Sequence, residues 1–200
     1  MSLGFRISGR IGKPVAEVFD AVVNPTKLSG YFTTIGGASA PLVAGTTVTW
    51  WKTVPVEVDE VTKDKRILLR WDATDTDGKP AYKTRIEMNF EPLEDGGTFV
   101  TIAEEGWHEG EVGLRKSYLN CEGWSQMLAC MKAYLEYGIN LRDGYYRSEL
   151  QGEPANETTS EPDIQAPISC RRPDDESNTI PDVRGKGRGG HDPLLRDHSR

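Results

Sequence analysis

Glu104 is the first candidate for chemistry in this 200-residue chain, because it is a carboxylate at a position where the pattern predicts an apolar side chain. Val100 and Ile102 alternate with Thr101 and Ala103, and this period of two predicts a strand with one buried face. The same period puts Glu104 on the buried face, where a carboxylate is costly unless it is paired or reached by water. Such a group could be a polar contact for a ligand, or a general acid or base with a raised pKa.

Three alternatives stay open for Glu104. The strand could end at Ala103, a bulge could turn Glu104 outward, or an arginine could pair with it. Glu105 has the opposite parity and is expected to face solvent, so it serves as a control. His108, just beyond, is the other candidate for proton transfer, although a lone histidine at a strand end is more often a surface residue. If the protein is an enzyme, Glu104 and His108 are its candidate catalytic residues.

No catalytic motif accompanies these two residues. The chain lacks a Gly-x-Ser-x-Gly elbow, a Gly-x-x-x-x-Gly-Lys-[Ser/Thr] loop, a His-Glu-x-x-His pair and a Cys-x-x-Cys pair. A zinc site needs three or four His, Cys or carboxylate ligands, so we expect no metal, and we expect no cofactor. These observations favour a protein that is not an enzyme.

Net charge and cysteine content limit which partners and which cellular compartment we expect for this protein. A net charge of −7 argues against a general nucleic-acid binder, which needs a basic excess. No apolar run approaches the roughly 18 residues of a membrane span, and no apolar signal core follows Met1. Cys121 and Cys130 are too far apart along one helix to bridge, so three cysteines indicate a reduced, cytoplasmic protein.

The elements that must position Glu104 follow from periodicity. Residues 5–11 alternate as a strand, Pro14 can begin a helix that ends at Asn24, and a second short helix over 25–31 follows. Residues 46–107 form a meander of five strands, which includes a strand over Thr46–Lys52 and a hairpin turn at Asp77-Gly78. With the first strand they make a six-stranded antiparallel sheet with one covered face.

The cover is an amphipathic helix over residues 123–138. Residues 109–122 contain Gly110 and Gly113 and are expected to be a flexible connection, serving either as a lid that carries Tyr118 or as an ordinary loop. Aromatic and methionine side chains under the helix suit an adaptable apolar pocket, although each of them could simply fill the core. The expected pocket residues are Trp71, Met88, Glu104, Trp107, Tyr118, Trp124, Leu128 and Met131.

The last 50 residues differ in composition from the rest. All phenylalanine, tyrosine and tryptophan residues fall at or before Tyr146, and the remaining sequence is polar, charged and without periodicity. We therefore expect a folded domain over residues 1–147 and a disordered polar tail over residues 148–200.

Four stretches, in the right order, resemble a known family. They are Val56-Glu-Val-Asp-Glu-Val-Thr-Lys-Asp-Lys-Arg-Ile-Leu-Leu-Arg-Trp71, Gly97-Thr-Phe-Val-Thr-Ile-Ala-Glu-Glu-Gly-Trp107, Gly123-Trp124 before Leu128, Met131 and Leu135, and Pro14 before Val18-Phe19-Asp20-Ala21. Together, over residues 3–142, they resemble the activator-of-Hsp90-ATPase-homologue-like branch of the START-related (SRPBCC) superfamily.

The resemblance implies an α+β helix-grip fold: a six-stranded antiparallel sheet curved around a long C-terminal helix, with two short helices after the first strand and an apolar cavity. It does not imply one activity. We expect a small hydrophobic or aromatic ligand to bind between sheet and helix without catalysis. The alternatives are a cyclase-, aromatase- or hydrolase-like enzyme that uses Glu104, and a chaperone-associated module with a protein partner. The chain is expected to be a monomer or a homodimer.

Overall fold

The computed structural model describes residues 3–74 and 82–145. The expected turn at Asp77-Gly78 and the expected tail over 148–200 lie outside these residues. Six strands in the described part form one antiparallel sheet in the order β1-β6-β5-β4-β3-β2. The strands are β1 (Leu3–Ile11), β2 (Thr47–Trp50), β3 (Val54–Thr62), β4 (Arg66–Ala73), β5 (Tyr82–Pro92) and β6 (Thr98–Trp107).

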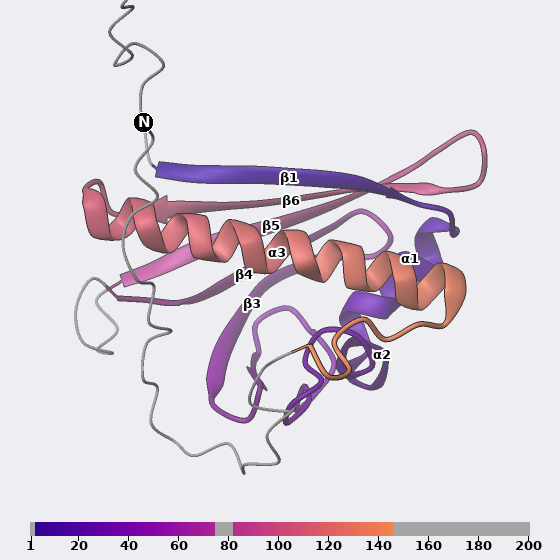
Figure 1. The fold of residues 1–200 in the computed structure, drawn as a ribbon, viewed down its shortest axis with the longest axis horizontal. Coiled ribbons are helices and arrows are strands. Elements are labelled where there is room, and N and C mark those ends of the chain that lie inside the picture. The colour runs from indigo at the N-terminus through magenta and orange to yellow at the C-terminus, as the bar shows by residue number, and fades with distance from the viewer. Residues whose placement is uncertain (1–2, 75–81, 146–200) are drawn as a thin grey trace, which may run out of the picture. The chain divides into compact units, whose positions relative to one another are not determined.

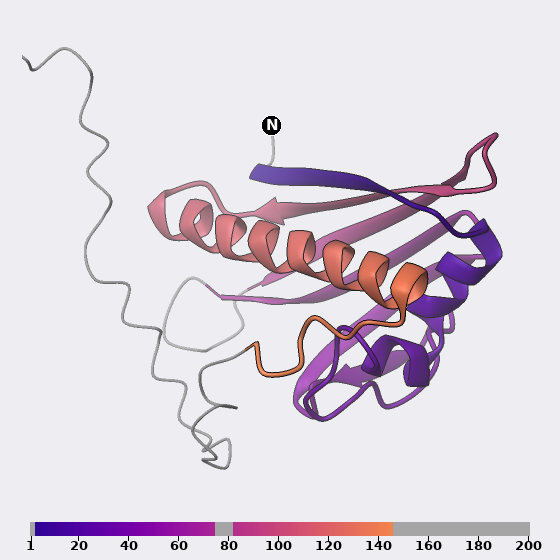
Figure 2. The same cartoon turned by 45° about the vertical axis from the view of Figure 1, so that its right-hand side comes forward.

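Two short helices follow β1, as the sequence predicts. Helix α1 (Val15–Val23) begins after Pro14, whose missing N–H costs nothing in the first turn. Asn24 ends α1 and caps α2 (Pro25–Ser29), because its side-chain oxygen accepts from the backbone N–H of Thr26 and Lys27 at 3.0 and 3.4 Å. Both helices lie at the end of the sheet where β1 finishes (Figures 1 and 2).

Helix α3 (Glu111–Tyr137) lies across one face of the sheet and alongside β1 (Figure 1). It begins at Glu111, so the expectation of a flexible connection over residues 109–122 is wrong. The buried positions of its first two turns are Gly113 and Ser117, which carry no apolar side chain, so an apolar period could not reveal them. A Cβ at Gly113 would stand 2.0 Å from the carbonyl oxygen of His108, so only glycine allows this close approach.

The core fills the space between α3 and the inner face of the sheet. On β5 the alternation is regular: Ile86 and Met88 are fully buried, and Arg85 and Glu87 are on the other face. The expected strand over residues 46–52 is shorter, because Trp51 and Lys52 take positive φ angles of 48° and 69° and turn the chain toward β3. Trp50 is therefore buried, and Trp51 lies half-buried beside it.

Candidate ligand site beneath the long helix

Glu104 is fully buried on β6 and faces α3, as its parity predicts. Its Oε1 accepts hydrogen bonds from the indole N–H of Trp71 at 2.9 Å and the hydroxyl of Thr84 at 2.6 Å. Its Oε2 accepts from the indole N–H of Trp124 at 2.8 Å. The Asn120 amide lies 3.2 Å from both oxygens. The carboxylate is thus paired with neutral donors and not with an arginine.

Four elements bring these donors to one point. The register opposes Glu104 to Ile86 on β5 and to Phe5 on β1, which places the carboxylate in the interior of the sheet. Thr84 comes from β5 and Trp71 from β4. Asn120 and Trp124 are four residues apart on α3, so one helix face presents both donors. The network therefore ties the long helix to three adjacent strands.

Burial raises the pKa of Glu104 above its ordinary value of 4.5, because the charged form loses its water. The hydrogen bonds from Thr84, Trp71, Trp124 and Asn120 favour the charged form and oppose the rise. Desolvation is the larger effect, so protons bind this carboxylate more readily than they bind an exposed one.

An aromatic layer surrounds the network on the α3 side. The rings of Trp71 and Trp124 stack with centroids 5.2 Å apart, and Trp124 stacks on Phe32 at 5.6 Å. Trp50 meets Phe32 and Trp71 edge to face at 5.8 and 6.2 Å, and Trp51 meets Phe32 at 4.9 Å. Trp71 and Trp51 are half-buried, whereas Trp50 and Trp124 are buried, so the layer runs from the surface into the core.

The layer contains one buried polar group with no partner among the described residues. The indole N–H of Trp50 donates no hydrogen bond in this part of the chain, although Trp50 is fully buried. A buried N–H without an acceptor is costly and is therefore uncommon. The indole N–H of Trp107, outside the layer, is in the same situation.

The expected pocket residues separate into groups. Trp71, Glu104 and Trp124 come together around the carboxylate. Met88 and Met131 are fully buried in the core, and Trp107 is buried near the end of β6. Leu128 faces β1, and Tyr118 is 65% exposed. Tyr118 therefore belongs to the outer surface of α3 and not to a lid.

His108 lies apart from Glu104. It is exposed, and its ring stacks on Tyr82 with centroids 3.6 Å apart. Three residues lie between it and Glu104, but Glu104 is fully buried beneath α3 whereas His108 is exposed beyond the end of β6. The two side chains are therefore not placed to act on the same atom.

The expected pocket residues leave out three members of the aromatic layer, Phe32, Trp50 and Trp51, and two donors to Glu104, Thr84 and Asn120. Phe32 follows α2 in a stretch without periodicity, and Trp50 could not be distinguished from Trp51 by type. Thr84 looked like an ordinary strand residue. The one available signal was parity, because Thr84 alternates with Ile86 and Met88 toward the core.

The described residues contain neither a candidate metal-binding cluster nor a candidate membrane-spanning helix. No group of three or more His, Cys, Asp or Glu side chains in residues 3–74 and 82–145 could hold a metal ion. No helix in the same ranges has the length and apolarity needed to cross a bilayer.

The sheet order, the helix pair after β1 and α3 across one face define a helix-grip α+β fold. A family model for "Activator of Hsp90 ATPase homolog 1-like protein" matches residues 13–136, which is more than half of the chain. The chain belongs to this family, and the resemblance inferred from its motifs is confirmed. A search of the curated proteins gave no match.

Solved structures share the fold. The protein SSP2350 from Staphylococcus saprophyticus is 26% identical, with a TM-score of 0.58 over 70% of this chain and 96% of that chain. The Aha1 dimer from Colwellia psychrerythraea is 20% identical, with a TM-score of 0.57 over 68% of this chain and 98% of that chain. PFC0360w, described as an HSP90 activator from Plasmodium falciparum, is 19% identical, with a TM-score of 0.54 over 68% of this chain and 96% of that chain.

Proposed function

We propose that this domain binds a small, planar aromatic molecule within the aromatic layer beneath α3. The observation that carries the proposal is the buried indole N–H of Trp50, which has no acceptor among the described residues. A ligand carbonyl or ether oxygen would satisfy this donor, and the neighbouring rings of Phe32 and Trp71 would stack on its faces. The half-buried Trp71 and Trp51 mark the route of entry.

In this proposal Glu104 is a positioning residue. Each of its oxygens already accepts two or three hydrogen bonds, and a carboxylate has about four acceptor sites in total. A ligand donor would have to displace a protein donor, which makes direct contact costly. Glu104 instead sets the orientation of Trp71, on which the ligand would stack, and of Trp124, which stacks on both Trp71 and Phe32.

The test uses flavone, an aromatic ketone with a carbonyl acceptor, as the probe, and NMR signals of the tryptophan indole N–H groups as the readout. We expect the Trp50 signal to move furthest as flavone is added to the full chain. Trp50→Phe removes the donor and should weaken binding about fivefold, the effect of one hydrogen bond. Trp107→Phe removes the other unpartnered indole N–H, outside the layer, and should leave the affinity unchanged.

Two results would contradict the proposal. One is an unchanged Trp50 signal at saturating flavone, and the other is equal weakening by Trp50→Phe and Trp107→Phe. Native mass spectrometry of protein purified from its own host would identify a natural ligand directly. Glu104→Gln separates a carrier from an enzyme, because turnover lost with affinity retained would indicate catalysis.

Family membership supports a second candidate, a protein that stimulates the ATPase of an Hsp90-type chaperone. The family is named for that activity, and PFC0360w of the same fold is described as an HSP90 activator. The measurement is the ATP hydrolysis rate of the host's Hsp90 with and without the full chain. An unchanged rate across a range of concentrations would exclude this candidate and leave the ligand-binding proposal untouched.

A further inference from the structure

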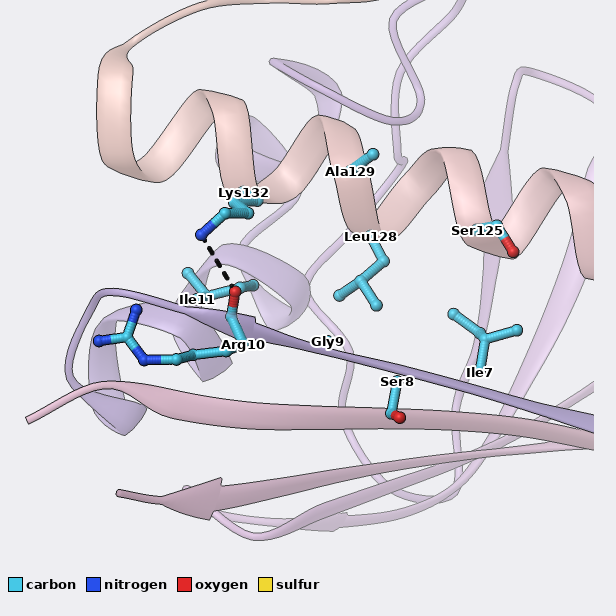
Figure 3. A pocket seen from close by; sticks show the side chains of 9 residues that line it. All are labelled: Ile7, Ser8, Gly9, Arg10, Ile11, Ser125, Leu128, Ala129 and Lys132. Carbon is cyan, nitrogen blue, oxygen red and sulfur yellow. Dashed lines mark hydrogen bonds between the residues drawn. The ribbon is translucent and has the colours of Figure 1, made fainter. Parts of the chain in front are cut away.

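The outer edge of β1 forms a second candidate site, separate from the aromatic layer. β1 is an end strand of the sheet, and within the described residues it pairs only with β6. α3 runs beside it, and between them lies a cavity of about 250 Å³ (Figure 3). The cavity is lined by Ile7, Ser8, Gly9, Arg10, Ile11, Ser125, Leu128, Ala129 and Lys132.

The size and lining of this cavity suit one side chain better than a whole ligand. Pockets for drug-sized molecules measure roughly 300–1,000 Å³, which is larger than this cavity. The side chains of Ile7 and Leu128 point toward one another across it (Figure 3), and the exposed Ala129 and the β1 backbone at Gly9 also line it. Gly9 has no Cβ, and a Cβ there would stand 3.1 Å from Leu128.

The backbone edge beside the cavity is closed at one end and open at the other. Lys132 Nζ donates to the carbonyl of Arg10 at 3.1 Å, and Glu136 accepts from the N–H of Gly12 at 2.6 Å. The N–H and C=O of one strand residue point the same way, and this direction alternates along the strand. Arg6 and Ser8 therefore present their backbone groups to the same outer side as Arg10. Within the described ranges, no side chain bonds to the backbone groups of Arg6 or Ser8.

Charge on this edge selects the occupant. Arg6, Ser8 and Arg10 point their side chains to the outer face of the sheet and are exposed. Arg10 is held by Asp95, with nitrogen to oxygen distances of 3.0 and 2.6 Å, whereas Arg6 has no ion pair with any described residue. A second copy of β1 added antiparallel over these residues would bring arginines opposite or diagonal to one another, which is destabilising. An acidic strand would be attracted.

We propose that this edge binds an extended, acidic peptide segment of a partner protein as an added strand. The segment pairs with the N–H and C=O groups of Arg6 and Ser8, and this backbone pairing supplies the affinity. One apolar side chain of the segment enters the cavity against Leu128 and Ala129. Acidic side chains on its other face lie beside Arg6, which supplies the specificity.

The test is a titration of the full chain with a synthetic peptide of alternating glutamate and valine or leucine, followed by backbone amide NMR. We expect the amide signals of Arg6 and Ser8 to shift. Ser8→Pro removes an N–H that faces away from β6, so it deletes a bond to the peptide without deleting a bond of the sheet. It should weaken binding at least about fivefold. Arg6→Glu should weaken binding roughly fivefold at low salt and less at high salt.

Controls separate this site from general attraction. Lys63→Glu makes the same change of charge at an exposed position in the β3–β4 turn and should leave the affinity unchanged. A peptide with lysine in place of every glutamate should not bind. Ala129→Glu adds a negative charge beside the cavity, which should repel the acidic peptide and weaken its binding. Ala129 is on the exposed side of α3, so this variant tests the site even if Ser8→Pro prevents folding.

Four results would overturn the proposal. The lysine peptide binds as well as the acidic one, or Ser8→Pro and Ala129→Glu, when folded, bind like the wild type. Shifts confined to Trp71 and Trp124 would place the peptide at the aromatic layer instead. A dimer in analytical ultracentrifugation that Ser8→Pro dissociates would assign the edge to a second copy of this chain.

Discussion

Replacing Glu104 with alanine should destabilise the domain far more than the same change at Glu105, its neighbour on β6. The loss of the carboxylate leaves the buried donors of Thr84 and Trp124 without acceptors. Each buried unsatisfied group costs about 1–3 kcal/mol, and the space left by the side chain adds to that cost. Trp71 and Asn120 are half-buried, and water can satisfy their donors in part.

The expected loss is therefore about 3–6 kcal/mol, a large share of the roughly 5–15 kcal/mol that stabilises a typical domain. Glu105 is exposed, and among the described residues its side chain bonds only to Arg85, at 2.8 Å, so Glu105→Ala should cost about 0–1 kcal/mol. Urea unfolding followed by far-ultraviolet circular dichroism measures both free energies without depending on the tryptophan signal. Equal costs for the two variants would refute the role assigned to Glu104.

The pH dependence gives an independent test on the same residue. The pKa of Glu104 is raised in the folded state, so its ionisation destabilises the fold. The stability that protonated Glu104 contributes to the fold is fully present below its ordinary pKa of 4.5. This stability is lost as the pH rises through the raised pKa of the folded state. Glu104→Gln cannot titrate, so the wild type minus Glu104→Gln difference in unfolding free energy should shrink as pH rises. A difference that grows with pH would mean that the donated hydrogen bonds outweigh desolvation.

Two further changes test the elements that hold the site. Gly113→Ala should cost about 2–3 kcal/mol, because the new Cβ meets the His108 carbonyl at 2.0 Å, whereas Gly123→Ala, with open space around its Cβ, should gain about 0.5–1 kcal/mol. Thermal melts of the two variants should move in opposite directions, and melts that move together would contradict this account. Asn24→Ala removes the cap of α2 and should cost about 0.5–2 kcal/mol in urea unfolding, and an unchanged midpoint would show that the cap is dispensable.

The inward direction of Glu104 could be predicted because a strand repeats every two residues and Val100 and Ile102 set the parity. The side chains that donate hydrogen bonds to Glu104 could not be predicted. Trp71 is 33 residues away along the chain, Thr84 and Trp124 are each 20 away, and Asn120 is 16 away. Local periodicity carries no information on which side chains meet across such separations. Only the register of β4, β5 and β6 and the position of α3 bring them together.

The beginning of α3 shows a different limit. Periodicity detects a helix through apolar side chains on one face, and from Trp124 onward this signal is present in Met127, Leu128 and Met131. Nearer the start, the face toward the sheet is made of Gly113 and Ser117. Small residues there let the helix backbone approach the end of β6 closely, so the same contact that anchors the helix removes the signal that would have revealed it.

The Glu104 network also fixes the orientation of two indole rings. Apolar residues of similar volume in place of a buried polar group and its partners often hold a core together equally well, because desolvation consumes much of what hydrogen bonds return. They would not, however, select one orientation of the indole rings. Two hydrogen bonds, at 2.9 and 2.8 Å, direct the N–H edges of Trp71 and Trp124 to the same carboxylate and leave their faces stacked at 5.2 Å. Under the proposed function, fixed ring faces would reduce the entropy lost when a planar ligand binds, and Glu104 would supply that preorganisation.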